Sequence, residues 1–174
     1  MIILETERLI LREIVAADDA FMVDLLNQPS FIKYIGDRQV RTLEQARDFI
    51  ENRYRQSYRD HGFGLYAVEL KQNASEIRNP AIGICGFVKR DSLPGADIGF
   101  AFLPQYERKG YAFESASAVL KWGRETLGFD RVLAITSLDN DASIRLLEKL
   151  GFRFEGIIEG QTPAESLRLF SSEK

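Results

Sequence analysis

The hydrophobic and polar positions of this chain alternate as in a strand near its beginning and follow a helical period soon afterwards. The segment from Glu7 to Ile14 has the period of two that predicts a strand. Residues Asp18 to Asn27 predict a short helix that ends before Pro29. Thr42 and Gln45 are spaced as a capping box and predict the start of a second helix. Its expected apolar stripe consists of Leu43, Ala46, Phe49, Ile50 and Tyr54.

Three short segments, rich in β-branched and aromatic residues, follow this second helix. They span Gly62 to Leu70, Ala81 to Val88 and Ala96 to Leu103, and turn residues separate them. This pattern predicts an antiparallel meander of three strands. The polar stretch from Lys71 to Pro80 predicts a long hairpin loop between two of them rather than a boundary between domains.

The last part of the chain changes repeatedly between helical and strand-like patterns. A helical period begins at Gly110 and ends at Gly128, and Arg131 to Ser137 is a nearly unbroken apolar run. Such a run is typical of a strand that is covered on both faces. A further helix and two strands are expected over residues 140–150, 152–158 and 166–170. A meander followed by strand, helix, strand, helix and strand predicts an α+β fold with one mixed sheet.

The composition limits the kind of protein and its partners. With 174 residues, of which 45% are hydrophobic, we expect one domain over residues 1–174 with an adequate core. The net charge of -3 argues against a nucleic-acid partner, which would need a basic stripe. No run approaches the roughly 18 apolar residues of a membrane-spanning helix, and Met1 to Glu5 is charged too early for a signal peptide. We therefore expect a cytoplasmic monomer or homodimer with no nucleic-acid or membrane partner.

The single cysteine and the single histidine carry little chemical signal. Cys85 excludes an intrachain disulfide, and the sequence offers no cluster of metal ligands, so we expect no metal. The neighbours of this cysteine, Ile84 and Phe87, indicate a buried thiol on a strand. His61 precedes a Gly-Phe-Gly sequence and is interpreted as a loop residue rather than a base.

The segment from Pro104 to Ala112 has the properties of an anion-binding loop. Its backbone N–H groups would point toward an anion at the start of the following helix, and Gly110 would let a ligand approach the chain closely. Arg108 and Lys109 add positive charge. Taken alone, the loop is also explained as a solvated surface turn that contains a glycine.

A second helix start lies one strand further along the chain. Asn140 is the predicted N-cap, in competition with Asp139, and Ser143 is a first-turn residue. Two helix N-termini that each follow a strand can converge on one ligand with a phosphate end and an amide-rich arm. The pair is therefore a more specific signal than either helix start alone.

Four segments, in this order, resemble the Gcn5-related N-acetyltransferases (GNAT), and most closely their RimJ/RimL-like branch of ribosomal-protein N-terminal acetyltransferases. They are Thr6 to Arg12, Asp97 to Phe100, Lys109 to Ala112 and Asn140 to Phe152, and their span covers nearly the whole chain. The resemblance implies a mixed, mostly antiparallel sheet of about six or seven strands with about four helices. It also implies strands that splay at an acyl-CoA cleft.

The resemblance implies that acetyl-CoA binds as the cosubstrate and donates the acetyl group. Its pyrophosphate would lie on the loop from Arg108 to Ala112, and its pantetheine arm would run along Phe102 and Leu103. The implied cosubstrate-binding residues are Phe102, Leu103, Arg108, Lys109, Gly110, Tyr111, Ala112, Asn140 and Ser143. The family has Gln, Arg or an aromatic residue in place of Glu107 and a glycine in place of Arg108. We therefore expect CoA binding to survive in weakened form.

The expected chemistry is attack of a neutral amine on the thioester, followed by protonation of the leaving thiolate. Asp97 stands where related enzymes often carry a glutamate that accepts the proton of the amine through water, and Glu69 is the second candidate base. Ser143 is the candidate acid for the thiolate. Asp97 is also explained as an exposed carboxylate at a strand end, and Ser143 as a structural first-turn residue.

The candidate substrate-binding residues are Phe31, Tyr34 and Phe87, because the resemblance places the acceptor pocket between the loop of residues 31–34 and the central strands. The acceptor would be a protein N-terminus, a polyamine or a small-molecule amine. An acyl-CoA-binding sensor without turnover is the alternative, since Glu107, Arg108 and the short Asp97 depart from the family. A nucleotide enzyme with a phosphate loop is disfavoured, because the chain has no Gly-x-x-x-x-Gly-Lys-Ser/Thr sequence.

Overall fold

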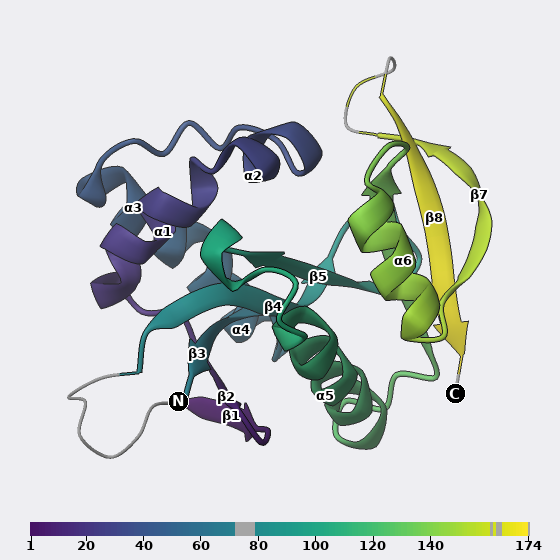
Figure 1. Ribbon diagram of the computed structural model, residues 1–174, viewed down its shortest axis with the longest axis horizontal. Coiled ribbons are helices and arrows are strands. Elements are labelled where there is room, and N and C mark those ends of the chain that lie inside the picture. The colour runs from purple at the N-terminus through teal and green to yellow at the C-terminus, as the bar shows by residue number, and fades with distance from the viewer. Residues whose placement is uncertain (72–78, 161, 163–164, 174) are drawn as a thin grey trace.

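The computed structural model describes residues 1–71, 79–160, 162 and 165–173 (Figure 1). In these residues one sheet of eight strands has the order β1-β2-β3-β4-β5-β6-β8-β7. The strands are β1 (Ile2–Glu5), β2 (Leu9–Arg12), β3 (Leu65–Leu70), β4 (Ala81–Lys89), β5 (Ala96–Phe102), β6 (Arg131–Ser137), β7 (Arg153–Glu159) and β8 (Ser166–Glu173). All neighbouring strands are antiparallel except β5 and β6, which are parallel. The predicted α+β class with a mixed, mostly antiparallel sheet is confirmed.

Helices cover both faces of the sheet, and in Figure 1 the helices α1 to α3 lie above β4 and β5 while α5 lies below them. The first group is η1 (Ala16–Asp18), α1 (Asp19–Leu26), α2 (Pro29–Tyr34), α3 (Leu43–Phe49), the π-helix η2 (Ile50–Arg55) and α4 (Gln56–His61). The second group is η3 (Pro104–Tyr106), α5 (Tyr111–Glu125) and α6 (Asp141–Lys149). Each face has its own apolar core. In the residues that the structure describes, no helix is both long enough and apolar enough to cross a bilayer.

The first helical region agrees with the predicted caps but differs in two details. The capping box is confirmed, because Thr42 Oγ1 accepts from the amide of Gln45 at 3.2 Å and Gln45 Oε1 accepts from the amide of Thr42 at 3.1 Å. Leu43 is wrongly assigned to the apolar stripe, since it is 46% exposed and the helix meets the core only from Ala46 onward. Pro29 begins α2, so residues 31–34 are helical rather than a loop. Proline is tolerated there because the first amide of a helix has no partner in any case.

The beginning of the chain folds as a hairpin rather than as one strand. The amide of Thr6 donates to the carbonyl of Leu9 at 2.9 Å, and β1 pairs with β2 across this turn. The added strand raises the number in the sheet above the six or seven expected. Gly62, with φ of 74°, ends α4, so His61 is the last residue of a helix and β3 begins later than predicted. Residues 72–78 of the predicted hairpin loop lie outside the described residues.

The parallel strands β5 and β6 separate shortly after they meet. They pair only at Asp97 and Leu133, whereas β4 and β8 pair with their outer sides along the whole length. Helix α5 connects the end of β5 to the start of β6, and α6 follows the end of β6. Because the carboxyl ends of parallel strands lie at one edge of a sheet, both helix starts lie at the open end of the splayed pair. This confirms the expected splay.

Candidate active site

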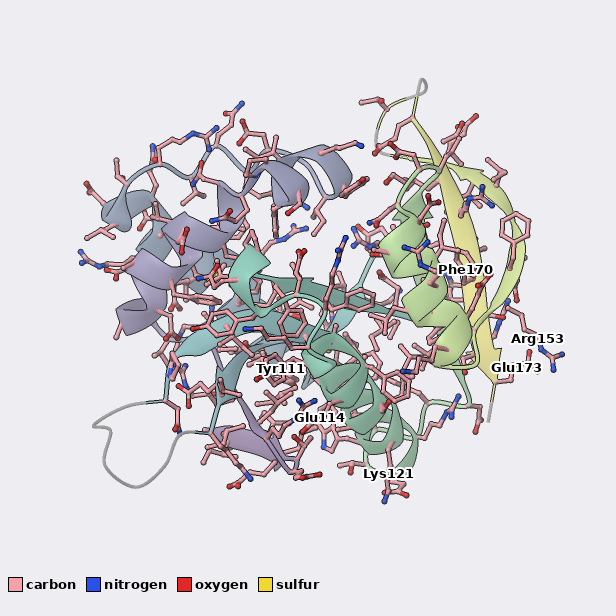
Figure 2. All side chains as sticks on the ribbon, viewed as in Figure 1. Tyr111, Glu114, Lys121, Arg153, Phe170 and Glu173 are labelled. Atoms are coloured by element: carbon pink, nitrogen blue, oxygen red, sulfur yellow. The ribbon has the colours of Figure 1, made fainter. Side chains whose placement is uncertain are left out.

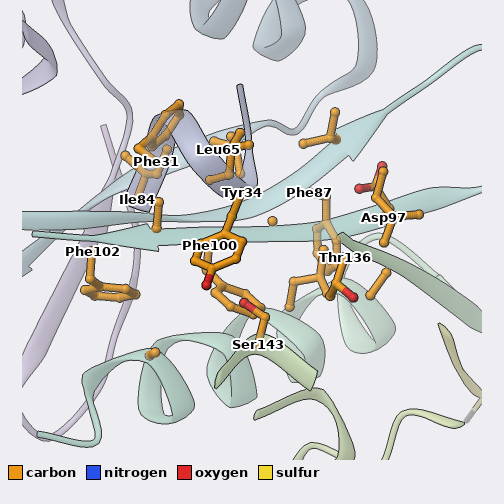
Figure 3. Close-up of a pocket in the computed structure, with 18 of the residues that line it drawn as sticks. Phe31, Tyr34, Leu65, Ile84, Phe87, Asp97, Phe100, Phe102, Thr136 and Ser143 are labelled. Atoms are coloured by element: carbon orange, nitrogen blue, oxygen red, sulfur yellow. The ribbon is translucent and has the colours of Figure 1, made fainter. Parts of the chain in front are cut away.

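A cavity of about 940 Å³ opens where β5 and β6 separate (Figure 3). Its walls come from the central strands, from the starts of α5 and α6 and from the segment between α2 and α4. In Figure 3, Tyr34 points from α2 into this space. The cavity brings together most of the predicted site residues, namely Phe31, Tyr34, Phe87, Asp97, Phe102, Arg108, Gly110, Tyr111, Ala112, Asn140 and Ser143.

The start of α5 offers unpaired amides at one end of the cavity. Gly110 is the N-cap with φ of 84°, and no side chain caps the helix. The first amides of a helix have no partner within it, and together with the helix dipole they attract an anion. Arg108 also has a left-handed backbone, with φ of 58°. A glycine would adopt this conformation more easily, so the departure from the family costs backbone strain.

The N-terminal hairpin positions this loop. Arg8 donates from Nη1 to the carbonyl of Lys109 at 3.0 Å, and its guanidinium group lies 4.6 Å from the centre of the Tyr111 ring. Glu114 accepts from Arg8 Nε at 2.7 Å and from Thr6 Oγ1 at 2.6 Å. Burial acts to raise the pKa of Glu114, but the bonds from Thr6 and Arg8 outweigh it and lower the pKa. Tyr111 and Glu114 lie at the start of α5 (Figure 2), so the N-terminal segment that resembles the family fixes this helix start.

The separated strands leave polar groups without partners along the cavity. Beyond Asp97 and Leu133, the facing edges of β5 and β6 do not pair with each other. The hydroxyl group of Thr136, on β6, is buried, lines the cavity and has no hydrogen-bond partner among the described residues. Buried polar groups are nearly always paired in proteins. An extended ligand with several amides would pair with both edges as an added strand does, which fits the pantetheine arm of CoA.

The start of α6 supplies the opposite wall. Asn140 Oδ1 accepts from the amide of Ser143 at 3.2 Å, which confirms Asn140 as the N-cap. Its competitor Asp139 pairs instead with Lys33 at 3.1 Å. The hydroxyl of Ser143 forms no hydrogen bond within the described part of the chain, and the residue lines the cavity. Both residues therefore carry polar groups at the wall opposite β5.

Asp97 is buried at the point where β5 and β6 meet. Its side chain is 1% exposed, and its two carboxylate oxygens accept from Arg90 Nε at 3.0 and 3.2 Å. Burial raises the pKa of Asp97 to about 6, although the charge and hydrogen bonds of Arg90 act to lower it. At neutral pH the carboxylate is therefore ionised and more basic than an ordinary aspartate. It is not an exposed carboxylate at a strand end.

Three of the predicted site residues do not line the cavity. Glu69 lies on β3, which β4 separates from β5, and it accepts from Arg12 Nε at 2.7 Å. Leu103 is 5% exposed and belongs to the core beneath α1 to α4. The ammonium group of Lys109 lies 5.7 Å from the centre of the Tyr106 ring. Of the two candidate bases, only Asp97 is at the cavity wall.

Strand β4 carries two residues singled out in the sequence whose side chains are fully buried, and of the two only Phe87 lines the cavity. Phe87 is fully buried, and its ring contacts Phe63, Trp122 and Phe129. Although it reaches the cavity, it is mainly a core residue. Cys85 is fully buried as predicted, and burial raises the pKa of its thiol to about 12, so the thiol stays protonated. In the described residues, no three His, Cys, Asp or Glu side chains are grouped as a metal site requires.

Several charged residues at the cavity were missed by the sequence reasoning. Arg38 follows α2, Arg53 is on η2 and Arg90 follows β4, and all three line the cavity. No hydrophobic period marks these positions, because each lies in a connection or in an irregular helix. The one available signal was the spacing of Arg90 and Asp97 on either side of a hairpin turn, which places them close together across two paired strands.

Comparison with known proteins finds acetyltransferases that resemble this chain. A family model described as an acetyltransferase (GNAT) domain matches residues 8–153. The uncharacterized N-acetyltransferase YoaA of Bacillus subtilis (strain 168) is 32% identical over 157 residues, which are 90% of this chain and 85% of that protein. The crystal structure of a GNAT-family acetyltransferase from Bacillus anthracis is 28% identical with a TM-score of 0.78, and the match covers 99% of this chain and 98% of that chain.

A more distant relative has a defined activity. The ribosomal protein uS5-alanine N-acetyltransferase of Escherichia coli (strain K12) is 28% identical over 125 residues, 67% of this chain and 60% of that protein. The region that the family model matches contains every residue that lines the cavity. The chain therefore belongs to the acetyltransferase (GNAT) family and is an acetyltransferase enzyme.

Proposed function

We propose that the enzyme transfers the acetyl group of acetyl-CoA to a primary amine by direct attack within a ternary complex. The observation that carries this proposal is the cavity between β5 and β6, which extends from the uncapped start of α5 to the buried carboxylate of Asp97. One end of the cavity suits a phosphate group, and the other end contains a carboxylate that can accept a proton. A donor and an amine held in one cavity react without the entropic cost of a bimolecular encounter.

The donor end would bind CoA mainly through backbone groups. The amides from Gly110 to Ala112 would hold its pyrophosphate, and Arg108 would add positive charge. Thr136 and the open edges of β5 and β6 would pair with the amides of the arm. Glu107 also lines the cavity, and its charge would oppose phosphate binding. Bound there, acetyl-CoA supplies the acetyl thioester.

The proton transfers would involve two residues of this cavity. Asp97 would accept the proton of the attacking amine through water, and Ser143 would donate a proton to the leaving thiolate. The pKa of Asp97, raised by burial to about 6, makes its carboxylate a suitable base near neutral pH. Glu69 has no part in this proposal, because it is paired with Arg12 away from the cavity.

The similarity to the uS5-alanine enzyme supports placing the chain in the RimJ/RimL-like branch. This similarity does not identify the acceptor, because function depends on the site rather than on the fold. Phe31 and Tyr34, both at the cavity, would form the wall against which the acceptor packs.

Calorimetry with CoA, followed by a free-thiol assay with acetyl-CoA and a panel of amines, tests this function. We expect CoA to bind with about -7 to -8 kcal/mol, in the micromolar range, and thiol release that depends on an amine. Binding of CoA without turnover on any amine would replace the proposal with an acyl-CoA sensor. Absence of CoA binding would overturn both.

A further inference from the structure

Most arginines of this protein have a partner, and the exceptions gather at the cavity. In the described part of the chain, the arginines with no ion pair, hydrogen bond or ring contact are Arg38, Arg53, Arg108, Arg145 and Arg153. All of them except Arg153 line the cavity. Unpaired cations in a concave site, where field lines are focused, indicate anionic ligands.

The four arginines at the cavity fall into two pairs at different places. Arg108 precedes α5 and Arg145 lies on α6, so both are near the helix starts of the donor end. They suit the phosphate groups of CoA. Arg38 follows α2 and Arg53 lies on η2, among the elements that cover the other face of the sheet. This second pair therefore lies on other elements than the phosphate loop and suits another anion.

Arg38 and Arg53 lie close enough together to affect each other. Burial lowers the pKa of Arg38, and the nearby positive charges of Arg53 and Arg90 lower it further. Arginine keeps its charge in proteins, so the lowered pKa reports mainly the cost of burying this charge, with repulsion from Arg53 and Arg90 as a smaller contribution, rather than loss of a proton. Arg90 is already paired with Asp97, whereas Arg38 and Arg53 have no such partner among the described residues. A bound anion would relieve the repulsion.

The backbone around Arg53 is also unusual. Residues Ile50–Arg55 form a π-helix between α3 and α4. Single π-turns within helical segments are uncommon and are often found at functional sites. Asn52, Arg53 and Tyr54 of this segment all line the cavity. The irregular helix thus supplies two polar side chains, Asn52 and Arg53, and the buried ring of Tyr54 to one wall.

The other ionisable residues at the cavity form no ion pair with Arg38 or Arg53 in the described part of the chain. Besides Arg90, Asp97, Arg108 and Arg145, they are Asp60, His61, Lys89, Asp91, Glu107 and Lys149. Asp60 and Asp91 are exposed, and neither forms an ion pair with Arg38 or Arg53 in the described residues. The buried anion is Asp97, which suits an ammonium group and is held by Arg90. The acceptor end therefore offers a buried site for a cation beside two free cations.

We propose, resting on the acetyl transfer proposed above, that the acceptor is a small amine that also carries a carboxylate or phosphate group. Arg38 and Arg53 bind this anionic group while the amino group lies near Asp97. Guanidinium groups bind carboxylate and phosphate through paired hydrogen bonds. The same two charges repel a polyamine, which has no anionic group to offer them. Of the acceptors left open by the sequence, the charge pattern thus favours a small zwitterionic molecule.

Matched acceptors test this inference with the full chain, acetyl-CoA and a free-thiol assay. One arm compares leucine with leucinamide and isoamylamine, which lack the carboxylate. A second arm compares 2-aminoethyl phosphate with ethanolamine, and spermidine serves as the polycation. We expect kcat/KM for leucine or for 2-aminoethyl phosphate to exceed that of its counterpart without the anionic group at least tenfold, and the arm with the larger ratio identifies the anion.

Variants connect the preference to the two arginines. Arg38→Gln and Arg53→Gln should reduce the ratio between acceptors with and without the anionic group toward one, by raising KM for the acceptor that carries it, with unchanged CoA affinity by calorimetry. Arg55→Gln is the matched control, because Arg55 lies on the same π-helix, pairs with Glu51 and does not line the cavity. It should keep the parent ratio.

The outcomes separate this inference from the proposed function. Turnover of amines that lack an anionic group, spermidine included, with no preference for acceptors that carry one would overturn the inference alone. The same holds if both arginine variants keep the parent ratio. Binding of CoA with no turnover of any acceptor would overturn the acetyl transfer itself, and the inference with it.

Discussion

The proposed donor end of the cavity is built mainly from backbone groups, whereas the proposed acceptor end is built from side chains. At the donor end these are the uncapped amides after Gly110 and the unpaired edges of β5 and β6. At the acceptor end the side chains come from separate segments and include the charged groups of Arg38, Arg53 and Asp97. A substitution leaves the groups of a backbone site in place as long as the fold persists, whereas it replaces the binding group of a side-chain site.

This difference indicates that the two halves of the reaction are specified separately. A backbone site suits a donor that stays the same, because its shape follows from strand splay and helix position. A site made of side chains suits an acceptor that differs between relatives of one fold. Variants that disrupt one end at a time should therefore change CoA binding and turnover separately.

Gly110→Pro should have the largest effect and should remove CoA binding. Proline cannot adopt the φ of 84° found at this position, and it lacks one of the amides that face the anion. Calorimetry measures the binding, and circular dichroism reports the fold. Gly128→Pro, with φ of 73° beyond the other end of α5 and away from the cavity, is the matched control and should bind CoA. Normal CoA binding by a folded Gly110→Pro protein would disprove the phosphate assignment.

Asp97→Asn should lower kcat by about 10²-fold or more, the usual range for loss of a general base, without changing CoA affinity. In the parent enzyme, kcat should rise as the pH increases through about 6, because Asp97 must lose its proton to act as a base. The variant should lack this acidic limb. Glu69→Gln should retain it, since Glu69 is outside the cavity. An unaltered pH profile in Asp97→Asn would assign proton transfer to solvent.

Asn140→Ala and Ser143→Ala sharpen the contrast between binding and proton transfer within one helix start. Asn140→Ala removes the cap that holds the amide of Ser143, so it should raise KM for acetyl-CoA and lower the free energy of unfolding by about 1 kcal/mol. Ser143→Ala should lower kcat and spare acetyl-CoA binding. Steady-state kinetics and urea unfolding measure both variants. Equal effects on affinity alone would make Ser143 a structural residue.

Thr136→Val should have the smallest effect, and it should separate stability from binding. It removes a buried hydroxyl without a partner, so the free energy of unfolding without CoA should stay the same or rise by about 1 kcal/mol. The Kd for CoA should increase several-fold, because an amide of the arm loses its partner. Ser137→Ala is the control, since it also removes a buried hydroxyl group of β6 but the residue does not line the cavity. A similar loss of affinity in both variants would argue against the contact.

The parts of the structure that follow from neighbouring residues were predictable. The apolar run Arg131–Ser137 is β6 with the same bounds, and the caps at Thr42, Gly110 and Asn140 each start the expected helix. These features depend on hydrogen bonds over three or four residues or on the period of one segment. The N-terminal hairpin was not predicted, because its turn at Thr6 has no glycine or proline to mark it.

The sequence by itself determined the class of fold, the two helix starts and the family, since each depends on local order along the chain. Only the tertiary structure decided which carboxylate faces the cavity and which arginines remain without a partner. The sequence alone did not decide between Glu69 and Asp97 as the base. In the fold, Glu69 pairs with Arg12 on the neighbouring strand, whereas Asp97 is buried beside Arg90. Electrostatic pairing acts over a few ångströms in space. The partner of Glu69 is 57 residues away in the chain and that of Asp97 is 7 residues away, and each pair meets only when the strands come together in the fold.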